Sequence, residues 1–122
     1  MNTRHDVASQ TQLIFACSGA SDVGEIADLA ARQLAQQGVG RMFCLAGLGG
    51  DVPAILKTTR TATTILAIDG CQQECARKTL ERVGCHQFLH LQLEDLGLTK
   101  GDHPPTAERV DIVVRHAREM LT

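Results

Sequence analysis

Short apolar runs alternate along this chain with longer amphipathic segments, and no other feature constrains the fold as strongly. Each run is short enough to be a strand that is buried on both faces of a sheet. The runs, of which the last is the weakest, are residues 13–17, 41–45, 64–68 and 87–93. Because strands that alternate with helices are joined by right-handed crossovers, the sheet is expected to be mostly parallel, with helices on both faces.

The segments between and after these runs have helical signals. In the first segment apolar residues recur at helix spacing, Asp22 is a candidate N-cap with Glu25 three residues later, and Gly38 can end the helix. Residues 96–105, with two glycines and two prolines, are typical of a long loop. Further helices are predicted after Asp51-Val52-Pro53, between Gly70 and Gly84, and over about residues 107–121.

A chain of 122 residues fits one compact domain, and no internal repeat or linker divides it. We expect residues 13–122 to form a small three-layer αβα domain with a mostly parallel four-stranded sheet, Rossmann-like or flavodoxin-like. Residues 1–12 are expected to be a flexible N-terminal segment. The strand order can be 2-1-3-4 or 3-2-1-4, and the first three strands are neighbours in both orders.

Composition excludes several classes of partner. The net charge is −2, no long run of Lys or Arg is present, and Tyr and Trp are absent, so nucleic acid is not an expected partner. The apolar run at residues 13–17 is too short for a signal sequence or a membrane span, which predicts a cytoplasmic protein without membrane contact. Five cysteines in a reducing compartment are more typical of metal ligands or redox groups than of disulfides.

Three of the cysteines lie where predicted strands end. Cys17 ends the first run, Cys44 lies near the end of the second, and Cys71 follows the third. Because the carboxyl ends of parallel strands meet at one edge, these thiols should lie along one rim, with Cys75, a helical turn later, coming back toward Cys71. Four thiolates form the tetrahedral set that Zn²⁺ prefers, and an iron–sulfur cluster is the less favoured occupant.

A buried cysteine is often only a small apolar residue, and Cys17 or Cys44 alone would fit that role. Cys75 would not, because helical spacing places it to one side of the expected core stripe. Cys85 follows no strand and is expected to be structural or incidental. Two roles stay open for Asp69: it could accept hydrogen bonds behind the metal ligands, or it could be a turn residue. The histidines are not expected to be ligands: His5, His86, His90, His103 and His116.

Three spaced motifs stand out at the strand ends: Ala16-Cys17-Ser18-Gly19-Ala20, Arg41-Met42-Phe43-Cys44-Leu45-Ala46-Gly47, and Asp69-Gly70-Cys71 followed by Cys75-Ala76. Together they resemble the DGC-domain family, named for its Asp-Gly-Cys tripeptide. The resemblance is strong from residue 13 to residue 83. It implies a small α/β domain with four characteristic cysteines that bind zinc, matching Cys17, Cys44, Cys71 and Cys75 here, and it does not extend to Cys85.

The leading hypothesis is a metal-binding module in which zinc is structural, sensed, stored or delivered. The alternative is a thiol-redox or sulfur-transfer enzyme with Cys17 or Cys71 as the nucleophile. A cysteine-phosphatase loop is disfavoured because Val23 stands where such a loop needs an arginine, and the glycines at 47, 49 and 50 lack the spacing of nucleotide-binding fingerprints. A metal ion is the expected partner; a protein partner is unknown, and pairing into a homodimer stays open.

Overall fold

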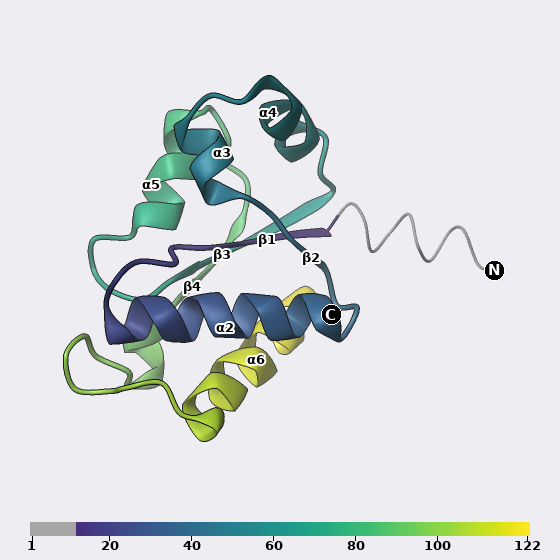
Figure 1. Cartoon of the computed structure of the whole chain (residues 1–122). Helices are drawn as coiled ribbons and strands as arrows, with labels where there is room; N and C mark the ends of the chain where they lie inside the picture. The colour runs from purple at the N-terminus through teal and green to yellow at the C-terminus, as the bar shows by residue number, and fades with distance from the viewer. Residues whose placement is uncertain (1–11) are drawn as a thin grey trace.

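The computed structural model describes residues 12–122, which form a parallel four-stranded sheet with helices on both faces (Figure 1). The strand order is β2-β1-β3-β4. This confirms the predicted small α/β domain and selects the 2-1-3-4 order, which is that of flavodoxin-like sheets. The predicted flexible segment lies outside the described residues, apart from Gln12, which begins the first strand. The strands are β1 (Gln12–Ala16), β2 (Arg41–Met42), β3 (Thr64–Asp69) and β4 (Leu89–Gln92).

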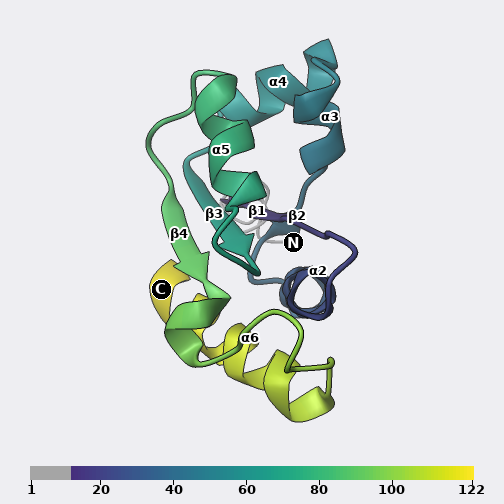
Figure 2. The ribbon, with the colours of Figure 1, turned by 90° about the vertical axis from the view of Figure 1, so that its left-hand side faces the viewer.

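Two groups of helices enclose the sheet (Figure 2). A short 3₁₀ helix, η1 (Leu93–Leu96), follows β4. One face of the sheet is covered by α2 (Asp22–Gln36) and α6 (Ala107–Leu121), and the other by α3 (Leu45–Gly49), α4 (Pro53–Arg60) and α5 (Cys75–Arg82). Within the described part of the chain, no helix combines the length and apolar character needed to cross a membrane.

Alternate residues of the strands enter two separate apolar layers. In β1, Ile14 packs on the α2 and α6 side, whereas Leu13 and Phe15 pack on the opposite side. β3 repeats the pattern with Leu66 and Ala67. All five side chains are fully buried. Because both faces of the sheet are covered, its central strands have uninterrupted apolar sequences.

The direction in which the chain winds reverses between β1 and β3. From β1 the chain passes through α2 to β2 on one side, and it later returns to β3 on the other side of β1. In open parallel sheets, ligands bind outside the carboxyl ends of the strands at such a switch point. The turns that follow β1 and β3 therefore mark the expected ligand site.

The start of α2 differs from the prediction. Ser21 is the N-cap, and its hydroxyl accepts the N–H of Gly24. The Asp22 carboxylate instead accepts the N–H groups of Gly101 and His103, so it ties the loop before α6 to the start of α2. Sequence spacing could not distinguish these roles, because Ser and Asp are both good caps.

The second strand is shorter than predicted. It ends at Met42, and Cys44 becomes the N-cap of α3, a helix that the sequence pattern did not predict. The Cys44 sulfur accepts the N–H of Gly47 at 3.3 Å. The α4 helix starts as expected at Pro53, although Val52 rather than Asp51 holds the N-cap position.

Candidate functional site

The turn after β1 ties Cys17 to the end of β3. The N–H of Cys17 donates to the carbonyl of Ile68 at 3.1 Å, and its sulfur accepts the N–H of Gly70 at 3.4 Å. The next residue, Ser18, has a φ of 51°, in the left-handed region that residues other than glycine rarely adopt. Cys17 is therefore held, half-buried, between the carboxyl ends of the two central strands.

The turn after β3 is packed closely against the start of α2. A side-chain carbon on Gly70 would lie 2.7 Å from the carbonyl carbon of Val23, so the position has room only for glycine. The chain then turns through residues 71–74, where the N–H of Glu74 donates to the carbonyl of Cys71. Cys75 is the first residue of α5. The prediction that Cys75 lies one turn into the helix is wrong, because Cys71 belongs to the preceding turn.

Asp69 anchors α5 from the end of β3. Its buried carboxylate accepts the N–H groups of Ala76 at 2.8 Å and Arg77 at 3.1 Å, so it satisfies two donors of the first helical turn. His90 Nε2 lies 2.8 Å from the same carboxylate, and His90 Nδ1 lies 3.9 Å from a Glu74 oxygen. Asp69 therefore accepts hydrogen bonds at the start of α5, behind the cysteine turn, and its role behind metal ligands stays a prediction.

The role of His90 follows from strand register. His90 pairs with Ala67 across β3 and β4, and Asp69 lies two residues beyond Ala67 on the same face. The sequence shows that a histidine occurs in a weak strand, but it does not specify which residue of β3 that histidine faces. For this reason His90 was not recognised as part of the site.

Three of the predicted cysteines line one pocket at the switch point, which we call the switch-point pocket. Its volume is about 390 Å³, and Cys17, Cys71 and Cys75 lie in its wall with Asp69 and Glu74. Cys71 is half-buried and Cys75 is exposed. The sequence argument that thiols from different strand ends gather at one edge is consistent with this arrangement.

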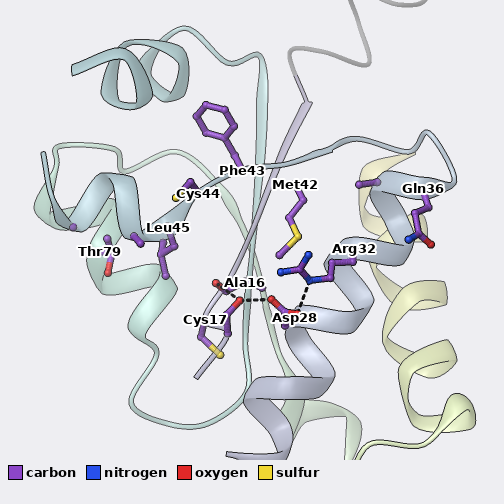
Figure 3. A pocket seen from close by; sticks show the side chains of 14 residues that line it. Ala16, Cys17, Asp28, Arg32, Gln36, Met42, Phe43, Cys44, Leu45 and Thr79 are labelled. Carbon is purple, nitrogen blue, oxygen red and sulfur yellow. Dashed lines mark hydrogen bonds and ion pairs between the residues drawn. The ribbon is translucent and has the colours of Figure 1, made fainter. Parts of the chain in front are cut away.

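Cys44 lines a second, larger pocket of about 900 Å³, which we call the α2–α3 pocket (Figure 3). Cys17 belongs to the lining of both pockets, so the two adjoin there. Figure 3 shows the Cys44 sulfur on the α3 side and the Cys17 sulfur below Asp28. Across residues 12–122, no three His, Cys, Asp or Glu side chains converge closely enough to hold a metal ion. The four-cysteine ligand set thus stays a prediction.

Comparison with known proteins decides the family. The DGC domain profile matches residues 13–117. The chain belongs to the DGC domain family. It is also 41% identical over 88 residues to the anaerobic and virulence modulator AnvM of Pseudomonas aeruginosa, an alignment that covers 72% of this chain and 67% of that protein. No solved structure matches the chain.

The environment of Cys17 in this DGC domain disfavours its thiolate. Burial raises the pKa of the thiol, and the nearby Asp69 and Cys75 charges raise it further, against the lowering effect of the Gly19 and Gly70 N–H groups. Cys17 is therefore a protonated thiol unless a cation compensates the buried charge. A thiophilic metal ion would supply such a charge, because it displaces the proton of a thiol ligand.

Cys85 lies at the opposite edge of the sheet. Its N–H donates to the carbonyl of Leu80 at the end of α5, and its half-buried side chain packs against the core on the α5 side. Burial raises the pKa of its thiol. These contacts support the expectation that Cys85 has a structural role.

Proposed function

We propose that this DGC-domain protein binds a thiophilic metal ion, zinc in the first place, through Cys17, Cys71 and Cys75, with Cys44 as the fourth thiolate. The observation that carries the proposal is that three of these thiols, from two strand ends and a helix start, line one pocket, the switch-point pocket. A closed set of four thiolates would suit a structural, sensed, stored or delivered ion better than hydrolytic catalysis, which needs an open position for water.

The donors near the pocket favour sulfur over oxygen ligation. Both oxygens of Asp69 already accept N–H groups of α5, and His90 contacts one of them. Glu74 pairs with Arg77. The thiols of Cys71 and Cys75 have no such partners among the described side chains. The available donor set is therefore soft, and soft thiolates select zinc and similar metals rather than magnesium or calcium.

Binding requires the thiols to rearrange, since they do not converge in this structure. The sulfur of Cys17 accepts a backbone N–H from Gly70, and the sulfur of Cys44 accepts one from Gly47. N–H donors of this kind stabilise a thiolate once it forms. These backbone N–H groups could therefore stabilise the thiolates of Cys17 and Cys44 when the side chains turn toward a common ion.

A thiol-redox or sulfur-transfer activity is the second candidate. The raised pKa of Cys17 argues against this residue as the nucleophile, because the thiolate is the reactive form. Cys71 is the better choice, since Cys17 and Cys75 line the same pocket and either could resolve a mixed disulfide.

The test is to purify the untagged protein without chelator and to measure its metal content and free thiols. We expect about one zinc ion per chain, with about four thiols protected from alkylation until the metal is removed. Cys17→Ser, Cys71→Ser and Cys75→Ser should each lower zinc affinity at least about tenfold, because changing even a hydrogen-bond partner of a metal ligand costs about 10–100-fold. Cys85→Ser is the matched control and should keep the zinc.

A protein that neither retains nor takes up zinc, and whose Cys71 is alkylated much faster than its other thiols, would overturn the metal proposal. That result would instead favour the thiol-redox candidate.

A further inference from the structure

The α2–α3 pocket has two chemically different sides (Figure 3). On the α2 side lie Asp28, Arg32 and Gln36, with Met42 beside Arg32, and across from them lies Leu45 of α3. The metal proposal uses only the thiols at its edge. A concave site with an apolar wall and a few polar groups on one side is the usual form of a small-molecule site.

We propose that the α2–α3 pocket binds a small organic carboxylate that carries one negative charge and an apolar body. Arg32 would hold the carboxylate, and Met42 and Leu45 would contact the apolar body. This inference goes beyond metal binding. Two proposed metal ligands, Cys17 and Cys44, line this pocket, but none of the residues assigned to the carboxylate or to its apolar body is a proposed metal ligand.

Arg32 is oriented but retains unused donors. Its Nε donates to Asp28 Oδ2 at 2.7 Å, and the other Asp28 oxygen accepts the Ser18 hydroxyl at 2.8 Å. The terminal Nη nitrogens of Arg32 have no hydrogen-bond partner within residues 12–122. A guanidinium fixed through Nε presents its Nη groups to a carboxylate in the planar geometry that such pairs prefer.

The charge of the lining selects a monoanion. Its ionisable cation and carboxylate are Arg32 and Asp28, and its other polar groups are neutral hydroxyls, an amide and thiols. An ionised Asp28 repels a second negative charge, and phosphate groups usually require several cationic or N–H donors. A single carboxylate is therefore favoured over a phosphate or a dicarboxylate.

The ring of Phe43 is not part of the apolar side of this pocket. It meets the buried ring of Phe15 edge to face, with centroids 6.0 Å apart, and Figure 3 shows it pointing away from Arg32. The apolar body of the ligand is therefore assigned to Met42 and Leu45, which lie in the lining on either side of the pocket.

The experiment is a ¹H–¹⁵N NMR titration of the full-length protein with hexanoate, 1-hexanol and adipate. We expect hexanoate to bind with a Kd of about 1–10 mM, as a ligand of this size allows, and to shift the amides of residues 16–18, 32 and 42–45. Hexanol lacks the charge and adipate adds a second one, so both should bind at least about fivefold more weakly. Equal binding of all three, or shifts spread over the whole surface, would overturn the inference.

Two variants and a control locate the carboxylate. Arg32→Gln should weaken hexanoate binding about tenfold and remove its advantage over hexanol. Arg115→Gln is the matched control, because Arg115 makes the same kind of ion pair with Asp111 four residues earlier but lies on α6, away from the pocket. It should leave binding unchanged.

Gln36→Glu changes the exposed end of the polar side and should also weaken hexanoate, by charge repulsion. If both Arg32→Gln and Gln36→Glu bind hexanoate as the unmodified protein does, Arg32 does not hold the carboxylate. Zinc content serves as the independent readout of the metal proposal in all of these variants.

Discussion

The turns that follow the two central strands differ from the turns that lead into the two outer strands. In the turns that lead into β2 and β4, at the amino edge, the left-handed positions are Gly38 and Gly84, with φ of 75° and 87°. In the turns that follow β1 and β3, at the carboxyl edge, they are Ser18 and Glu74, with φ of 51° and 54°. Glycine adopts this conformation without strain, whereas another residue loses about 1–2 kcal/mol.

The difference separates the part of the molecule built for stability from the part built for a site. The amino edge uses the least strained residue and carries only Cys85. The carboxyl edge carries the other four cysteines, the buried Asp69 and the strained turns at Ser18 and Glu74. Strain of this kind persists where the surrounding structure holds it in place, and it is concentrated at ligand and active sites.

The largest expected effect is the loss of the Asp69 anchor at the carboxyl edge. Asp69→Ala leaves the Ala76 and Arg77 N–H groups and His90 without their acceptor, which should lower the free energy of unfolding by about 3 kcal/mol. Urea denaturation measures this loss of stability. Asp95→Ala, at an exposed position on η1, is the control and should change little. A loss below about 1 kcal/mol would show that Asp69 does not hold α5 in place.

The next effect tests how tightly the β3 turn packs on α2. In Gly70→Ala the new methyl group would lie 2.7 Å from the backbone of Val23, so the free energy of unfolding should fall by about 2 kcal/mol. Gly49→Ala makes the matched comparison, because a methyl group at Gly49 meets nothing within 4 Å and its φ is not left-handed. If both variants were equally stable, the close contact between the two central turns would be absent in solution.

A smaller expected effect on stability tests the backbone strain in one turn at each edge of the sheet. Gly84→Ala introduces a side chain at a left-handed position with no atom within 4 Å, so only backbone strain acts, and stability should fall by about 1 kcal/mol. Ser18→Gly removes the corresponding strain at the carboxyl edge, and the gain should offset the lost hydrogen bond to Asp28 to within about 0.5 kcal/mol. A large loss in Ser18→Gly would mean that the hydrogen bond, rather than strain, dominates that turn.

The smallest expected effect is on the stability of the fold at acidic pH. The N–H groups of Gly101 and His103 lower the pKa of Asp22, so this carboxylate stabilises the fold above its ordinary pKa of about 4. The contribution should be lost as the pH falls through the lowered, folded-state pKa. Between about pH 5 and pH 2, a range that spans the ordinary aspartate pKa, Asp22→Asn should therefore lose slightly less stability than the unmodified protein. Identical acid curves for the two proteins would contradict this role.

The sequence by itself determined the elements whose signals are local. The helical signals predicted a helix over about residues 107–121, which are the bounds of α6, and the short apolar runs predicted a mostly parallel α/β sheet with thiols at its carboxyl edge. These features depend on the burial of one segment at a time, which periodicity records. The family resemblance relied on the same short motifs, and the DGC profile match confirmed it.

Only the tertiary structure decided how those segments meet. It chose the strand order, placed His90 against Asp69 through the register of β3 and β4, and divided the four cysteines between two adjoining pockets that share Cys17. It also made Cys44 the cap of a helix instead of the end of a strand. These outcomes depend on contacts between residues far apart in the chain, and the pattern within a single segment contains no information about its neighbour's register.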